Sequence, residues 1–147
     1  MGHIEVTKVF ANIAPDALFA TVADTSTWGE WFTVHEKFME EPPAKLEVGS
    51  RLVEKVVMLG MANKLESTIT ALDAPNTLTV AGTGMAGVKC EFTFSMKPEG
   101  TGTELTIAGD FDGALIKGAL GKAVEKDGTK HLSKSLDQLA VLAATRA

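Results

Sequence analysis

Cysteine, histidine and tyrosine are scarce in this sequence, which holds one cysteine, three histidines and no tyrosine. The single thiol, Cys90, excludes an internal disulfide framework and is typical of a reducing compartment. The histidines and Cys90 are scattered without the paired spacing of metal ligands, so the sequence predicts no metal site and no cofactor. The absence of tyrosine removes one common proton-donating hydroxyl from any binding site.

Long hydrophobic runs and basic clusters are also missing. No apolar run approaches the length of a membrane span, and the N-terminus lacks a charged and then hydrophobic secretory pattern. Acidic residues outnumber basic ones by 19 to 14, which gives a formal net charge of −5. Nucleic-acid binding normally needs a basic patch. We therefore expect a cytoplasmic protein that neither inserts into membranes nor binds nucleic acid.

The chain from Gly113 onward contains no proline and ends in a leucine-rich half. Leu132, Leu136, Leu139 and Ala143 recur at helical spacing. They share one face of a predicted helix that runs to the C-terminus, either unbroken or as two joined segments. Such a stripe of apolar side chains needs an apolar partner surface.

Three glycines, Gly118, Gly121 and Gly128, fall within this helix. Each interior glycine costs a helix roughly 1 kcal/mol relative to alanine. The sequence therefore predicts a break or a close backbone approach near Gly118 and Gly121, at the mouth of a cavity beneath the helix.

Apolar and polar residues alternate over most of the chain before that helix, which predicts strands. The alternation is clearest from Val88 to Met96. The predicted strands cover residues 4–10, 35–41, 51–58, 62–72, 77–81, 88–96 and 103–111. Pro15 begins a short helix after the first strand, and residues 24–27 interrupt it and offer capping oxygens for a second short helical turn. Trp28 and Trp31 are predicted to be core side chains.

Six consecutive strands with no helix between them must form an antiparallel meander. A meander with one apolar face and a helix with one apolar stripe together predict a two-layer α+β domain. With 147 residues and 45% hydrophobic composition, the chain is predicted to form a single domain over residues 1–147.

The order of several motifs resembles the START/Bet v 1-like (SRPBCC) superfamily, in its polyketide cyclase/dehydrase branch. These motifs are APDALF at residues 14–19, Trp28 and Trp31, Gly49-Ser50 before a strand, and the leucine-rich last helix. The resemblance implies a helix-grip fold, in which a curved antiparallel sheet of about six to seven strands wraps around the last helix. It also implies a cavity between them. Members bind lipids, polyketides, hormones or other apolar molecules, and only some are catalysts.

A closer likeness is to an actinobacterial subgroup described as toxins of type II toxin–antitoxin pairs. His35, the turn Gly60-Met61-Ala62 and Gly87-Val88 carry this likeness. It implies an antitoxin protein as partner, although no residue here shows a toxin's chemistry.

The primary hypothesis is that a small hydrophobic molecule binds between sheet and helix. Five methionines lie in or beside the predicted strands, Met61 and Met85 among them. The flexible side chain of methionine adapts to apolar ligands of varied shape, but it also fills gaps in ordinary cores. His35, at the start of a strand, is the predicted polar anchor, with a structural histidine as the alternative. The predicted ligand-binding residues are His35, Met39, Met58, Leu65, Ile69, Phe92, Phe94, Met96, Leu132 and Leu136.

The second hypothesis is a cyclase or aromatase acting in the same cavity. Catalytic residues stay unknown, because a triad of Ser67, His35 and Asp110 can be assembled without any context that singles it out. Cys90 is predicted to act as a small hydrophobic residue. Glu54 falls, with other glutamates, at a strand position predicted to face water. His131 and Ser135 lie near the leucine stripe and face either the sheet or solvent.

One sequence motif suggests a nucleotide site that its context contradicts. Residues 82–87 match G-x-G-x-x-G, but dinucleotide binding requires these glycines to lead into a helix. Here they lead into the strand that begins near Val88, so the segment is predicted to be a glycine-rich hairpin.

Overall fold

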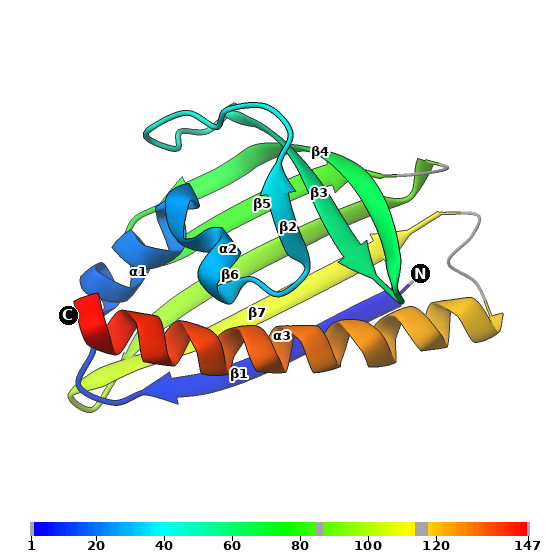
Figure 1. Cartoon of the computed structure of the whole chain (residues 1–147). Coiled ribbons are helices and arrows are strands. Elements are labelled where there is room, and N and C mark those ends of the chain that lie inside the picture. The colour runs from blue at the N-terminus through cyan, green and yellow to red at the C-terminus, as the bar shows by residue number, and fades with distance from the viewer. Residues whose placement is uncertain (1, 85–86, 114–117, 147) are drawn as a thin grey trace.

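A seven-stranded antiparallel sheet curves around one long helix in the computed structural model, which describes residues 2–84, 87–113 and 118–146 (Figure 1). The predicted α+β class is confirmed, including two short helices after the first strand and a long C-terminal helix. The elements are β1 (Gly2–Phe10), α1 (Pro15–Ala23), the 3₁₀ turn η1 (Thr25–Thr27), α2 (Trp28–Trp31), β2 (His35–Phe38), β3 (Arg51–Met58), β4 (Met61–Asp73), β5 (Thr77–Thr83), β6 (Lys89–Glu99), β7 (Gly102–Asp112) and α3 (Gly118–Arg146).

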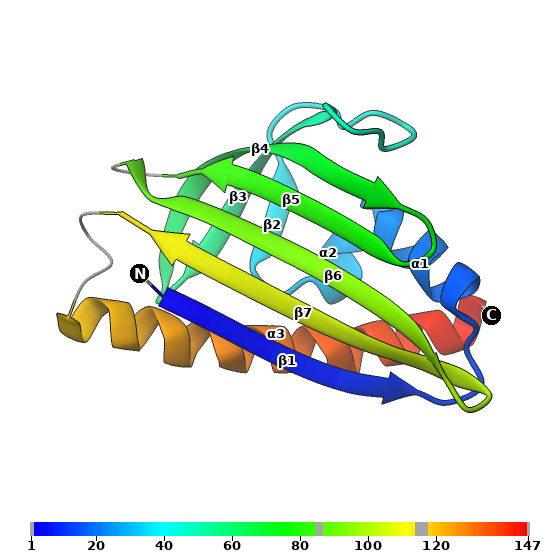
Figure 2. The ribbon, with the colours of Figure 1, turned by 180° about the vertical axis from the view of Figure 1, so that it is seen from behind.

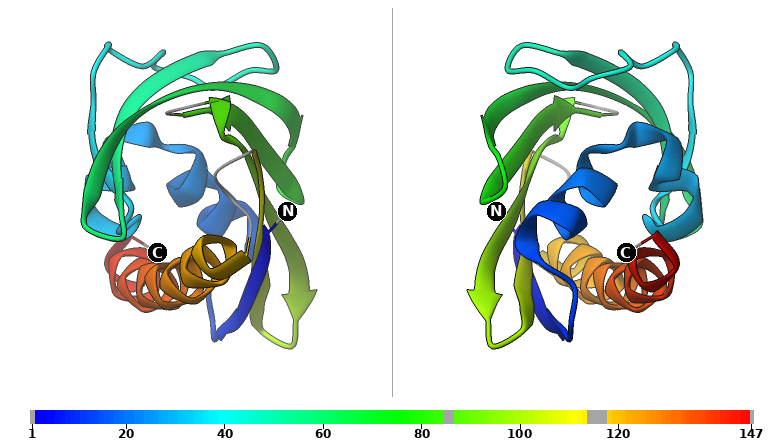
Figure 3. Two further views of the ribbon diagram at one scale, coloured as in Figure 1. Left: turned by 90° about the vertical axis from the view of Figure 1, so that its right-hand side faces the viewer. Right: turned by 90° about the vertical axis from the view of Figure 1, so that its left-hand side faces the viewer.

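The strands from β2 to β7 form a meander, and β1 extends the sheet by pairing with β7 (Figure 2). Each strand has one face toward α3. On β6, Phe92 and Phe94 are buried, while Glu91 and Ser95 on either side of them are exposed. The end views show the sheet curling over α3, so that the two layers enclose an interior (Figure 3).

The predicted strand 35–41 ends earlier than expected, at Phe38. Its pairing with β3 shifts register between His35 and Lys37, and Pro42-Pro43 follows, which cannot donate backbone hydrogen bonds. The other predicted strands coincide with observed ones to within three residues at each end. Gly87 and Val88 are followed directly by β6 at Lys89, and positions 85 and 86 of the predicted hairpin lie outside the described residues.

The apolar stripe of α3 faces the sheet as predicted, with Leu132, Leu136, Leu139 and Ala143 each at most 3% exposed. The helix begins at Gly118 and continues without a break to Arg146. The close approach predicted near Gly118 and Gly121 is found at Gly128. A Cβ atom added there would lie only 2.8 Å from Ile4 Cδ1 on β1. No helix in the described ranges combines the length and apolar character needed to cross a membrane.

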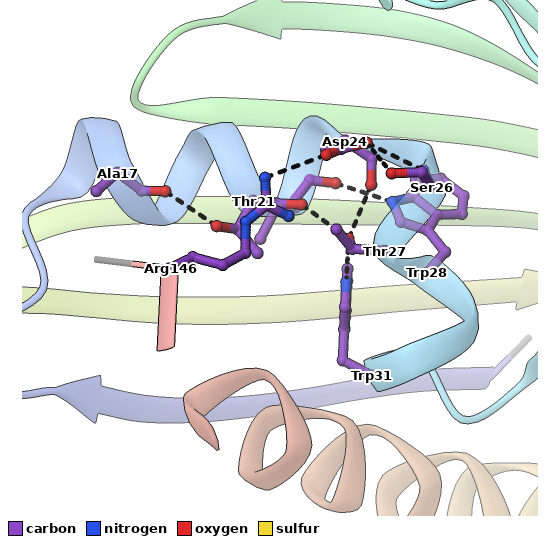
Figure 4. Close-up of polar contacts among 9 residues, drawn as sticks. Ala17, Thr21, Asp24, Ser26, Thr27, Trp28, Trp31 and Arg146 are labelled. Atoms are coloured by element: carbon purple, nitrogen blue, oxygen red, sulfur yellow. Dashed lines mark hydrogen bonds and ion pairs between the residues drawn. The ribbon is translucent and has the colours of Figure 1, made fainter. Parts of the chain in front are cut away.

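The short helices fill the end of the layer beside the C-terminus of α3 (Figure 4). Trp28 and Trp31 are buried, and their indole N–H groups donate to Val22 O and Thr27 Oγ1, each at 2.9 Å. Asp24 caps η1 by accepting from Ser26 N, and its second oxygen lies 3.1 Å from Arg146. Both tryptophans are therefore core residues with satisfied donors, as predicted.

Candidate functional site

A cavity of about 150 Å³ lies between the sheet and the N-terminal half of α3. It reaches the surface at Met61 and Leu120, which are 54% and 40% exposed. Its lining is almost wholly apolar and comes from the β3–β4 hairpin, β6, β7 and α3. The lining residues are Val34, Val56, Met58, Leu59, Met61, Asn63, Leu65, Gly84, Val88, Cys90, Phe92, Phe111, Leu120 and Val124.

The volume sets the size of guest that the cavity can enclose. An apolar cavity of about 150 Å³ holds one benzene ring, whereas sites for larger ligands typically run to roughly 300–1,000 Å³. The space therefore fits a single ring or a short alkyl chain. A larger molecule would leave the remainder outside, past Met61 and Leu120.

Three of the predicted ligand-binding residues, Met58, Leu65 and Phe92, lie in the cavity wall. Met39 lies outside the cavity and is 51% exposed, because β2 ends one residue before it. The others belong to the hydrophobic core and not to the cavity wall, and among them Phe94 packs its ring against that of Trp31. These are Ile69, Phe94, Met96, Leu132 and Leu136. Of the remaining methionines, Met61 is at the rim, and Met85 lies outside the described residues.

The predicted polar anchor, His35, does not line the cavity. Its Nδ1 makes a short hydrogen bond to Glu54 Oε2, and both side chains are 3% exposed. The imidazole packs between Trp28 and Phe38, with ring centroids at 6.0 and 4.5 Å. The prediction that Glu54 faces water is wrong, because Glu54 shares the inner face of β3 with Leu52 and Val56.

Cys90 lies in the cavity wall on β6. Its burial, together with the negative charge of nearby Glu54, raises the pKa of the thiol from 9.0 to about 12. The thiol therefore stays protonated near neutral pH, and a protonated thiol is a poor nucleophile. This agrees with the prediction that Cys90 acts as a small hydrophobic residue.

The triad that the sequence allowed does not assemble. Asp110 lies on the outer side of the sheet, where its Oδ1 is 2.6 Å from His3 Nδ1. Ser67 and His35 both point inward, and the carboxylate beside His35 is that of Glu54. In the described residues, no group of three histidine, cysteine, aspartate or glutamate side chains is placed to hold a metal ion.

Hydrogen bonds between polar groups join α3 to the loop before β2. Ser135 Oγ accepts from Thr33 N at 3.0 Å, and His131 Nδ1 lies 3.0 Å from Thr33 Oγ1. Ser135 is fully buried, whereas His131 is 29% exposed. Of the two alternatives, Ser135 therefore faces inward and His131 lies at the helix edge. Both contact the loop rather than the sheet, so they position α3 and do not line the cavity.

Sequence reasoning missed several wall residues. Val56, Leu59, Val88, Phe111 and Val124 line the cavity beside the predicted residues. Val56 follows Glu54 by two residues, so the alternation that includes Leu52 and Met58 indicated its inward direction. Nothing in the sequence marked Leu59, because its side chain is placed by the turn at the tip of the β3–β4 hairpin.

The chain is similar to known proteins in both sequence and fold. The family model described as polyketide cyclase/dehydrase and lipid transport matches residues 1–144. An uncharacterized protein from Mycobacterium tuberculosis is 30% identical over 130 residues, covering 88% of this chain and 91% of that protein. A second protein of that organism, named as a toxin, is 26% identical over 112 residues, covering 76% of this chain and 78% of its own.

A solved structure shares the architecture. The Zhui aromatase/cyclase from Streptomyces sp. R1128 superposes with a TM-score of 0.77 at 18% identity, covering 98% of this chain and 94% of that one. At this identity, the likeness shows a common fold alone.

Proposed function

This chain belongs to the polyketide cyclase/dehydrase and lipid transport family, and we propose that it binds a small hydrophobic molecule between the sheet and α3. The observation that carries the proposal is the apolar cavity of about 150 Å³ beneath the helix. An ordinary core is packed without voids larger than a water molecule, so a space of this size needs an explanation. A guest molecule provides one.

The size of the cavity bounds the expected affinity. An enclosed ring buries about 150 Å² or more of apolar surface. At about 25 cal/mol per Å², this burial gives roughly 4 kcal/mol, which corresponds to a Kd of about 1 mM. Tighter binding requires either polar contacts or a ligand that extends through the opening.

A titration with small ligands tests the proposal. Toluene, indole and hexanol are added to ¹⁵N-labelled protein, and we expect chemical-shift changes centred on Val56, Leu65 and Phe92. A blocking variant, Val124→Phe, places a ring in the cavity from α3 and should abolish these changes. Val141→Phe on the same helix is the matched control, because Val141 is 70% exposed. Binding that survives in Val124→Phe, or no binding of any probe, contradicts the proposal.

A second candidate is a cyclase- or dehydrase-type reaction in the same interior. The observation that favours it is the buried pair of His35 and Glu54, since an imidazole held by a carboxylate is a common general acid–base arrangement. The required result is turnover of a polyketide-like substrate that is lost in His35→Gln while the fold is kept. Unchanged turnover in this variant removes His35 from the reaction.

The third candidate is the toxin of a two-component pair, with an antitoxin protein as partner. It is supported by the name of one relative that is 26% identical to this chain. Induced expression should then arrest growth, and co-expression of a neighbouring small gene should restore it. Normal growth on induction contradicts this candidate.

A further inference from the structure

A small, mostly apolar recess shares part of its lining with the cavity. Its volume is about 10 Å³, close to the space that one water molecule or one hydroxyl group needs. Three side chains, Leu65, Cys90 and Phe92, line both the recess and the cavity. The rest of the recess is formed by Trp28, Phe32, Glu54, Ser67, Val80 and Phe94.

The hydroxyl of Ser67 is buried, and it has no hydrogen-bond partner among the described residues. Ser67 is 2% exposed and shares the inner face of β4 with Leu65. Leaving a buried hydroxyl unpaired costs a folded protein about 1–3 kcal/mol. Such an unpaired group in the wall of a hydroxyl-sized space indicates that a polar atom occupies this space in the functional state.

Gly82 leaves room for the Ser67 hydroxyl because it has no side chain. On the sheet, Gly82 pairs with Ser67 on one side and with Cys90 on the other. A Cβ atom at Gly82 would lie 2.5 Å from Ser67 Oγ. Any other residue at this position would therefore fill the recess or displace the Ser67 hydroxyl.

Glu54 adds an acceptor to the same recess. One carboxylate oxygen of Glu54 is hydrogen-bonded to His35 Nδ1, and the Glu54 side chain also lines the recess. The recess thus offers an acceptor on Glu54 and a group on Ser67 that both donates and accepts.

Resting on the proposed function, we propose that this recess anchors the ligand through a hydroxyl group, so that the ligand class is a one-ring phenol. The ring lies in the apolar cavity, and the hydroxyl passes Leu65 to reach Ser67 and Glu54. Residues two apart on a strand are separated by about 7 Å, which is close to the length of such a molecule. The hydroxyl donates to Glu54 and accepts from Ser67.

Other polar groups fit the recess less well. A carboxylate would face the carboxylate of Glu54 and be repelled. A carbonyl oxygen could accept from Ser67 but would leave Glu54 without a donor. A hydroxyl both donates and accepts, and it therefore satisfies the two side chains together.

Three matched probes test the class of ligand: toluene, 4-methylphenol and 4-methylbenzoate. Their dissociation constants are measured by NMR titration of the full chain. We expect 4-methylphenol to bind at least about tenfold tighter than toluene, because two buried hydrogen bonds are gained. We expect 4-methylbenzoate to bind more weakly than either.

The variant Ser67→Ala tests the anchor. It should reduce the preference for 4-methylphenol over toluene by about threefold or more, with the toluene affinity unchanged. Because the Ser67 hydroxyl has no partner in the free protein, the urea midpoint of Ser67→Ala should be unchanged or higher. Ser95→Ala is the control, since Ser95 is exposed on β6.

Each outcome decides a different point. Equal affinities for toluene and 4-methylphenol, or a preference that survives in Ser67→Ala, overturn the anchor and leave the proposed function standing. Binding of 4-methylbenzoate as tightly as 4-methylphenol overturns the ligand class. Failure of all three probes to bind overturns both proposals.

Discussion

The carboxylate of Asp127 on α3 accepts a 2.9 Å hydrogen bond from the backbone N–H of Leu59, at the tip of the β3–β4 hairpin. Leu59 has a φ of +53° and Gly60 has a φ of +72°, as a tight two-residue hairpin turn requires. The left-handed conformation costs a non-glycine residue about 1–2 kcal/mol. Since Leu59 lines the cavity, Asp127 stabilises a strained turn that forms one wall of the proposed binding site.

The first prediction is that Asp127→Ala loosens this hairpin. Loss of the hydrogen bond should lower the free energy of unfolding by about 1 kcal/mol. It should also speed amide exchange at Leu59 and the release of a bound probe. Urea unfolding and NMR hydrogen exchange measure these effects. Asp137→Ala, on the same helix, is the control, because Asp137 is 73% exposed and forms an ion pair with Lys8 on β1. Equal exchange rates at Leu59 in both variants would contradict the role of Asp127.

Most of the fold was predictable because its signals are local. The leucine stripe from Leu132 to Ala143 has helical period, and the 88–96 segment alternates with strand period. The short turns between strands then leave an antiparallel meander as the simplest topology. The register shift in β2 and the close approach at Gly128 were not predictable, because each depends on a neighbouring element rather than on local sequence.

The binding site was predictable only in part. Met58, Leu65 and Phe92 face the cavity because they are inward residues at the right end of the sheet. Ile69 and Phe94 face inward too, but they lie at the end that Trp28 and Trp31 fill. Periodicity indicates which face a residue occupies and not how far along the layer the space remains open. Glu54 is predicted to face water with the other strand glutamates, whereas in the structure it lies buried on the inner face of β3.

The second prediction concerns the buried pair of His35 and Glu54. Removing either side chain leaves the other buried and unpaired, which should cost about 3–5 kcal/mol. Both His35→Ala and Glu54→Ala are therefore strongly destabilising. The double variant should cost less than the sum of the two by at least about 1 kcal/mol, because it removes both polar groups together. Urea unfolding of all four proteins gives the coupling energy. Additivity within about 0.5 kcal/mol would mean that the pair is not coupled.

The third prediction concerns Asp24, which links η1 to the end of α3. Hydrogen bonding from Ser26, aided by Arg146, lowers the pKa of the Asp24 carboxyl below 3.8. A carboxyl whose pKa is lower in the folded protein than in the unfolded chain stabilises the fold at pH values above its unfolded pKa. This contribution is lost as the pH falls through the pKa of the folded protein. Asp24→Ala should cost about 1 kcal/mol at neutral pH through loss of the cap.

The pH series supplies the check on Asp24. The difference in unfolding free energy between the native chain and Asp24→Ala should shrink as the pH is lowered below 3.8. Arg146→Ala should cost less than Asp24→Ala and respond to salt, because both side chains of that ion pair are more than a third exposed. A difference that is constant across the acid range would show that the carboxylate charge does not contribute.

The fourth prediction concerns alkaline pH and Cys90. The unfolded chain loses the thiol proton near pH 9.0, whereas the folded protein keeps it until about pH 12. Between these values the unfolded state binds fewer protons, so the free energy of unfolding falls as pH rises, by up to about 1.4 kcal/mol per pH unit. Cys90→Ala removes this dependence, and its urea-unfolding curve should therefore lose less stability than that of the native chain above pH 9.0. The absence of tyrosine removes another group that titrates near this range.

Iodoacetamide provides an independent measurement, since a protonated thiol in the folded protein should react only as fast as the protein unfolds. Two results together would contradict this prediction: rapid labelling of the folded chain at neutral pH, and parallel pH–stability curves for the native chain and Cys90→Ala. They would show that the Cys90 thiol ionises as readily in the folded state as in the unfolded one.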